Sequence, residues 1–163
     1  HAYAYCGFPR SLRAIQTFMQ VVDERRANGI NDVVGREVTE MNDNRTRYER
    51  GRDILAEISG TSVDAPKAGY AIFTPAIERF LKEHLFADIF ERDLLTYRER
   101  ELATVSILAG VGGVVAHATD QICLHLGVTA EQLSALLNIV EMNLGTSYSE
   151  PLRNILEQIV KQK

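Results

Sequence analysis

Residues 96–144 decide the fold of this chain, with the sequence TYRERELATVSILAGVGGVVAHATDQICLHLGVTAEQLSALLNIVEMNL. Thr96 and Thr129 each precede a stretch in which apolar residues recur every three or four positions, which is the period of an amphipathic helix. Glu99 and Gln132 follow these threonines by three residues, and such pairs cap a helix N-terminus reciprocally. The segment therefore predicts a series of capped, partly buried helices. The predicted helices cover about 97–111, 114–126 and 130–144.

Helical periodicity continues on both sides of this segment. Pro9, Pro75 and Pro151 each stand where a new apolar pattern begins, and proline suits the first turn of a helix. Thr74 is a candidate cap before Pro75, and Ser149 a candidate start before Pro151. No segment alternates with period two, so we expect an all-α fold. Further helices are expected at 9–27 and 46–59, from 75, and from 149, with connectors at 29–45 and 60–70.

The composition is typical of a globular protein. The chain has 163 residues, about one domain, of which 45% are hydrophobic and 25% charged. Its net charge is −4, with acidic and basic residues mixed along the chain. Because no basic stripe is present, we expect no nucleic-acid partner. No run approaches the roughly 18–20 apolar residues that span a bilayer, so we expect no membrane contact either.

Cysteine usage favours a reducing, cytoplasmic location. Cys6 and Cys123 are the only cysteines, and they form neither a C-x-x-C pair nor a spacing typical of metal ligands. We therefore expect no metal site and no cofactor.

Three segments carry a family resemblance. They are FLKEHLFADIFERDLLTYRERELATVSILAGVGG (residues 80–113), ICLHLGVTAEQLSALLNIV (residues 122–140) and HAYAYCGFPRSLRAI (residues 1–15). The first two resemble the carboxymuconolactone decarboxylase family, within the alkylhydroperoxidase D-like superfamily. The third resembles the end of a preceding copy of the same unit. The sequence Leu-Arg-Ala-Ile at 12–15 echoes Leu-Arg-Asn-Ile at 152–155, as repeated units do.

The resemblance implies an alkylhydroperoxidase D-like helical bundle built on an antiparallel helix hairpin. It divides the chain into the terminal helix of a preceding repeat (1–27), a linker with one helix (28–69) and a complete decarboxylase-like unit (70–163). It also implies a homo-oligomer, and the apolar stripe of the last helix fits a subunit contact.

The motif of the resembled family is incomplete in this chain. Glu101 matches the family's glutamate on the first core helix. Gly113 and Ala116 stand at the two cysteine positions of the redox-active members, so the thiols that a peroxidase needs are missing. Thr119 stands at the histidine position of the decarboxylase branch. His117 lies two residues upstream, about 200° away around a helix.

Five residues are candidate site residues. Glu101 is a candidate general acid or base, or alternatively a first-turn carboxylate favoured by the helix dipole. His117 is a candidate proton carrier, or a polar residue satisfied by backbone or water. Arg98 could bind a substrate carboxylate, with Arg92 as an alternative, or could belong to a solvated helix face. The candidate substrate-binding residues are Arg98, Thr119 and Tyr5.

Three functions remain open from the sequence. The first is a cofactor-free decarboxylase (a carboxy-lyase) acting on a small carboxylated lactone, with Glu101 and His117 as catalytic residues. The second is a peroxiredoxin-type, alkylhydroperoxidase-like oxidoreductase, for which only Cys6 and Cys123 could supply thiols. The third is a non-catalytic oligomeric binding module that keeps the fold without the chemistry.

Overall fold

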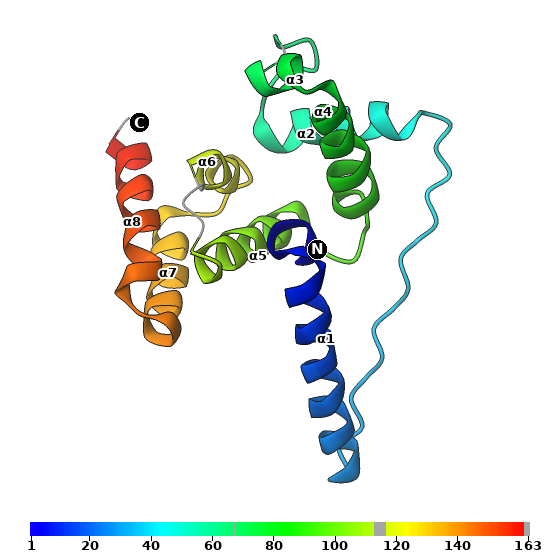
Figure 1. The fold of residues 1–163 in the computed structure, drawn as a ribbon, viewed down its shortest axis with the longest axis vertical. Coiled ribbons are helices and arrows are strands. Elements are labelled where there is room, and N and C mark those ends of the chain that lie inside the picture. The colour runs from blue at the N-terminus through cyan, green and yellow to red at the C-terminus, as the bar shows by residue number, and fades with distance from the viewer. Residues whose placement is uncertain (67, 113–116, 162–163) are drawn as a thin grey trace.

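The computed structural model describes residues 1–66, 68–112 and 117–161, and the side chains of 117–120 lie outside this description. The described residues form helices, turns and connectors without a strand, which confirms the all-α prediction. α7 and α8 lie side by side at one end of the molecule, and α5 runs through its centre (Figure 1). The elements are α1 (Tyr3–Ala27), α2 (Arg47–Ser59), α3 (Gly69–Phe73), α4 (Pro75–Phe80), the π-helix η1 (Leu81–Phe90), α5 (Tyr97–Gly110), α6 (His117–His125), α7 (Ala130–Leu144) and α8 (Thr146–Lys161).

The capping boxes predicted at Thr96 and Thr129 are both formed. A third box, at Thr46, was not predicted and opens α2. In each box the threonine hydroxyl accepts a hydrogen bond from the third backbone N–H, while the acidic or amide side chain there binds back to the threonine. Because these caps satisfy N–H groups that a helix leaves unbonded, they fix where α2, α5 and α7 begin.

The first helix begins earlier than predicted, at Tyr3 rather than Pro9. Gly7 interrupts it with φ 77° and ψ 163°, a conformation that a residue with a Cβ rarely adopts. The main run of the helix starts after this kink, with Pro9 in its first turn, where the missing N–H does no harm. The predicted range is therefore correct for the long run but omits the short turn before it.

Two other predicted helix starts differ from the structure. α8 begins at Thr146, and Ser149 is instead a fully buried residue whose hydroxyl donates to the Glu141 carboxylate at 3.2 Å. Thr74 does not cap α4, because its hydroxyl donates to the Tyr70 carbonyl of the preceding turn at 3.0 Å. The Thr74 hydroxyl thus bonds to the preceding helix, and the Ser149 hydroxyl lies within reach of both Glu141 of α7 and the Thr146 carbonyl oxygen of its own helix, at 3.3 Å.

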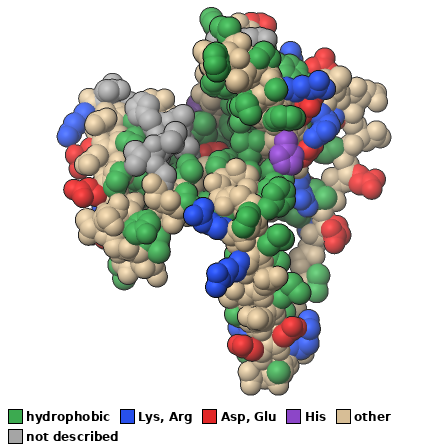
Figure 2. Space-filling model, viewed as in Figure 1, with side chains coloured by type: hydrophobic (Ala, Val, Ile, Leu, Met, Phe, Trp, Pro, Cys, Tyr) green, Lys and Arg blue, Asp and Glu red, His purple; other side chains and the backbone are tan. Residues whose placement is uncertain are grey.

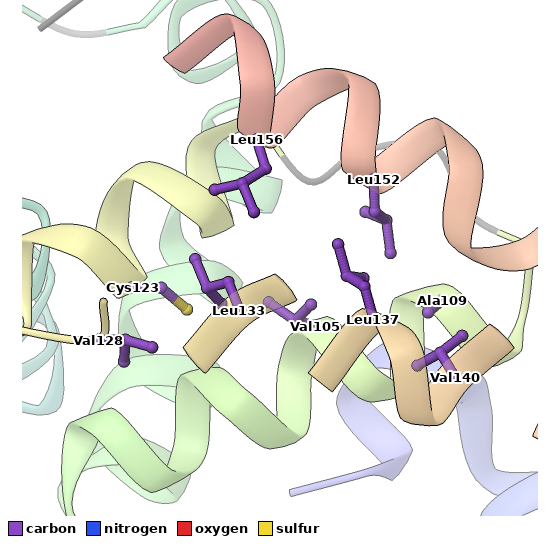
Figure 3. Close-up of a cluster of buried hydrophobic side chains, with 9 residues drawn as sticks. All are labelled: Val105, Ala109, Cys123, Val128, Leu133, Leu137, Val140, Leu152 and Leu156. Carbon is purple, nitrogen blue, oxygen red and sulfur yellow. The ribbon is translucent and has the colours of Figure 1, made fainter. Parts of the chain in front are cut away.

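The main hydrophobic core lies between α5, α6, α7 and α8 (Figure 3). The stripe of α8 that was expected to fit a subunit contact faces this core, so the apolar side chains of that stripe are satisfied within the chain. Fully burying one such aliphatic side chain stabilises the folded state by roughly 1.5–3 kcal/mol. The buried side chains are Val105, Ala109, Cys123, Val128, Leu133, Leu137, Val140, Leu152 and Leu156.

A second core joins α2 to η1 and is built around Ile58 and Phe90. The two helices approach closely at Gly51, where an added Cβ would lie 1.8 Å from the Lys82 carbonyl oxygen. Only glycine fits this contact. Tyr3 and Tyr5 of α1 pack against the same core, so the start of the chain is anchored beside α5.

Beyond Gly7, α1 projects away from the rest of the molecule (Figure 1). Hydrophobic side chains are visible on the surface of this projection in Figure 2. Five of its large apolar side chains are between 53% and 68% exposed, so the described chain leaves most of their surface uncovered. They are Phe8, Leu12, Ile15, Phe18 and Met19. No described helix is both long and apolar enough to cross a membrane.

Candidate active site

One face of the N-terminal half of α5 is buried although it carries polar residues. Arg100, Glu101 and Thr104 are each less than 5% exposed, and Val105 lies beside them. The apolar residues Leu102, Ile107 and Leu108 of the same helix are only half-buried. α5 is therefore rotated so that an acid, a base and a hydroxyl, rather than leucines, point into the protein.

Glu101 is the buried acid of this face, with 3% of its surface exposed. Burial disfavours the charged carboxylate and raises the pKa of Glu101 from 4.5 to about 7. Within the described residues no hydrogen bond or ion pair is made by its carboxylate. Glu101 is therefore close to half-protonated at neutral pH, which is the state that a general acid or base needs.

The start of the chain covers this face of α5. Nε2 of His1 lies 2.9 Å from the Thr104 hydroxyl oxygen, and that hydroxyl donates to the Arg100 carbonyl oxygen at 2.9 Å. When the hydroxyl proton is used in this way, Nε2 of His1 donates to Thr104. The His1 ring also packs against Tyr5 and Phe90, with ring centroids 5.3 Å and 5.2 Å apart.

Tyr5, a predicted substrate-binding residue, lies next to Glu101. Burial raises the pKa of the Tyr5 phenol to about 12, the Thr104 hydroxyl works against this shift, and the charge of Glu101 adds to it. The structure thus brings together Tyr5 and Glu101, which are 96 positions apart in the sequence. The Tyr5 phenol stays neutral across the physiological range and can act only as a hydrogen-bonding group.

The arginines near Glu101 in the sequence differ in their burial. Arg98, the predicted carboxylate ligand, is exposed and donates to the side-chain oxygen of Gln132. Arg100, which was not predicted as a site residue, is only 4% exposed and donates to the Arg92 carbonyl oxygen. Burial and the nearby charge of Arg92 lower the pKa of the Arg100 guanidinium. Its position four residues before Thr104 was the available signal, since i and i+4 share a helix face.

His117 and Thr119 stay predictions. α6 begins at His117, but the side chains of both residues lie outside the described part of the chain. The expected pairing of the His117 ring with the Glu101 carboxylate therefore stays a prediction as well.

The other described histidines and the two cysteines form hydrogen bonds within the fold or pack in its core. His84 binds Asp88 and the Tyr3 hydroxyl, and His125 binds the Glu57 carbonyl oxygen at 3.1 Å. Cys123 is completely buried in the main core, and Sγ of Cys6 lies 3.3 Å from the Ser11 hydroxyl. Among the described residues, no group of three or more His, Cys, Asp or Glu side chains is arranged to hold a metal ion.

A surface groove lies elsewhere, between the outer faces of α7 and α8, with a volume of about 520 Å³. None of the predicted site residues lines it. A second cavity, of about 390 Å³, has Phe90, Arg92 and Tyr97 in its wall. The candidate site therefore rests on the burial of the polar face of α5 and not on either of these hollows.

Comparison with known proteins identifies the family of this chain. The model of the carboxymuconolactone decarboxylase family matches residues 75–157, slightly more than half of the chain. The chain belongs to the carboxymuconolactone decarboxylase family. In this family member the match includes α5 with Arg100 and Glu101, whereas Tyr5 and His1 lie outside it. No curated protein and no solved structure gave a significant match.

Proposed function

We propose that this carboxymuconolactone decarboxylase family member is a cofactor-free decarboxylase of a small carboxylated lactone, with Glu101 as its proton donor. The supporting observation is the burial of Glu101, which raises its pKa to about 7 on a helix that the family model covers. A carboxyl group with this pKa can give up a proton near neutral pH and take one back from water.

The chemistry needs one proton and no redox partner. The bond between the ring carbon and its carboxylate breaks, CO₂ leaves, and the electron pair stays on the lactone, where conjugation with the ring carbonyl spreads it. The Glu101 carboxyl group then protonates carbon, and water returns a proton to the Glu101 carboxylate. In this proposal the neutral Tyr5 hydroxyl donates a hydrogen bond to the oxygen that gains charge, which the effect of the Glu101 charge on the Tyr5 phenol supports.

The test is CO₂ release from carboxymuconolactone by the whole chain, compared with its Glu101→Gln and Glu150→Gln variants. Glu150 is an exposed carboxylate on α8 and serves as the matched control. We expect Glu101→Gln to lose at least about 100-fold in rate, within the usual contribution of a general acid, and Glu150→Gln to keep full activity. Equal rates in the two variants would refute the role of Glu101, and no turnover by the wild type would refute the reaction.

The fraction of protein molecules that can catalyse the reaction should equal the fraction in which Glu101 is protonated. Since the donor must be protonated, the rate is expected to fall as pH rises above about 7.

The thiol peroxidase alternative finds less support, because Cys123 is completely buried in the main core and a thiolate must be reachable by the peroxide. A cytoplasmic location remains a prediction from cysteine usage.

The preceding repeat and the homo-oligomer also remain predictions, and α1 supports them. Its exposed apolar side chains stand at positions 8, 12, 15 and 19, the alternating spacing of four and three that one helix presents to another. The alternative of a binding module rests on this same face, and the decarboxylation assay separates it from the enzyme.

A further inference from the structure

A further cavity, of about 240 Å³, lies between α2, α3 and the connector that joins them. These elements lie in the upper part of the molecule in Figure 1. None of the predicted site residues lines this cavity, so it is separate from the polar face of α5. Most of its wall is apolar, and the side chains there include Leu55, Val63, Pro66 and Ala71.

A buried ion pair interrupts this apolar wall. Glu78 of α4 and Lys82 of η1 both line the cavity, and their side chains are paired with each other. A buried ion pair is often no more stabilising than two apolar side chains of similar size. Stability alone therefore does not account for this pair at the wall of a cavity. A mostly apolar cavity with a few convergent polar groups is instead typical of a small-molecule site.

Lys82 has one donor that the described residues do not use. Burial favours the neutral amine, but hydrogen bonds to Glu78 and Tyr48 outweigh it and raise the pKa of Lys82, so Nζ carries three N–H groups. Two of them bond to Glu78 and to the Tyr48 hydroxyl, and no third acceptor lies among the described residues. The hydroxyls of Ser59 and Thr61, which also line the cavity, are bonded to each other at 2.7 Å.

We propose that this cavity binds a small uncharged molecule with one ring and one acceptor oxygen, such as a ketone or an ester, which accepts a hydrogen bond from Lys82. Benzene fits an apolar cavity of roughly 150 Å³, and the larger volume here leaves room for a short substituent. Glu78 already pairs with the ammonium group, so a bound anion would bring an uncompensated charge into an apolar cavity. The inference goes beyond the proposed decarboxylation and does not depend on Glu101.

The test is an NMR titration of the whole chain with acetophenone, a ring that carries one ketone oxygen. We expect a Kd below about 1 mM, within the range for a good ligand of this size, and the largest amide shifts in α2, α3 and the start of η1. Ethylbenzene lacks the oxygen and should bind at least about 10-fold more weakly, because a hydrogen bond to a charged group is lost. Benzoate has a similar shape but a charge, and it should also bind at least about 10-fold more weakly.

Variants of the cavity wall locate the ligand. Ala56 of α2 lines the cavity, whereas Ala76 of α4 is exposed and lies outside it. We expect Ala56→Leu to weaken acetophenone binding at least about 10-fold by filling the space, and Ala76→Leu to leave it unchanged. The double variant Lys82→Met, Glu78→Leu replaces both partners of the pair and should still fold. It should bind acetophenone and ethylbenzene equally.

Four outcomes would overturn the inference. They are no detectable binding of acetophenone, equal binding of acetophenone and benzoate, an unchanged Kd in Ala56→Leu, and a preference for acetophenone over ethylbenzene that persists in the double variant. Acetophenone binding that Ala56→Leu abolishes, in a chain without decarboxylase activity, would refute the proposed function and leave this site intact. Decarboxylation without acetophenone binding would refute this site alone.

Discussion

Glu78 in α4 and Glu101 in α5 are both buried carboxylates, but their surroundings are opposite. Glu78 accepts hydrogen bonds from the Tyr48 hydroxyl, at 2.8 Å, and from the Lys82 ammonium. Glu101 has no such bonds within the described residues, and burial alone sets its pKa. The first arrangement pairs a buried carboxylate with a hydroxyl and an ammonium group as part of the structure. The second leaves a carboxyl group able to exchange its proton, as expected at a site of chemistry.

The largest expected effect is at the paired carboxylate. Lys82→Met should destabilise the fold at pH 8 by about 3–5 kcal/mol, because it removes the ammonium group that pairs with the buried Glu78 carboxylate. Urea unfolding followed by circular dichroism measures this change. The double variant Lys82→Met, Glu78→Leu should recover most of the loss, since an apolar pair of similar size replaces both charges. A loss below about 1 kcal/mol in the single variant would show that Glu78 does not depend on Lys82.

The next effect is at Glu101. Here the substitution is expected to raise the stability of the fold, whereas Lys82→Met lowers it. From pH 4.5 to about 7 the folded chain holds a proton on Glu101 that the unfolded chain releases, so the free energy of unfolding decreases as pH rises through this range. A pKa change from 4.5 to about 7 corresponds to roughly 3 kcal/mol. Glu101→Gln should remove this decrease.

The measurement is urea unfolding of the wild type and of Glu101→Gln at several pH values. The difference between the two should grow in favour of the variant from pH 4.5 to pH 7 and stay constant above it. A difference that does not change with pH would mean that Glu101 has an ordinary pKa, and the contrast with Glu78 would then disappear.

The smallest effect compares two tyrosines. Tyr48→Phe removes a hydrogen bond to a charged carboxylate and should cost about 1.5–3 kcal/mol at pH 8. Tyr5→Phe removes the hydroxyl beside a carboxyl group that is partly neutral, and should cost about 0.5–1.5 kcal/mol. Parallel urea titrations give both numbers. Equal losses would indicate that the two carboxyl groups carry the same charge.

The chain contains one sequence pattern in two structural settings, which shows how far the sequence alone could go. Leu12 and Leu152 begin the same short motif on amphipathic helices, and both helices were predicted. Leu152 is 2% exposed because α8 packs against the core that it shares with α5, α6 and α7, whereas Leu12 is 55% exposed on the projecting part of α1. Periodicity predicts a helix with an apolar face, but not what covers that face.

The sequence also indicated only some of the residues of the candidate site. The sequence indicated Glu101 through a family motif and Tyr5 as a pocket residue, but it favoured Arg98 over Arg100. On a helix these two arginines are about 200° apart, so the rotation of α5 decides which one is buried. The apolar residues of this stretch predicted a helix but not its rotation. The half-buried positions of Leu102 and Ile107 show the actual orientation.

The sequence by itself determined the helical fold class, the capped starts of α5 and α7, and the family, because caps and periodicity act over a few neighbouring residues. Only the tertiary structure decided that burial raises the pKa of Glu101 to about 7, that Arg100 is buried without an ion pair among the described residues, and that Glu78 has one. These properties depend on how much water and which charges surround a side chain. Residues far apart in the chain set both, such as His1 and Tyr5 against α5 or Tyr48 against Glu78.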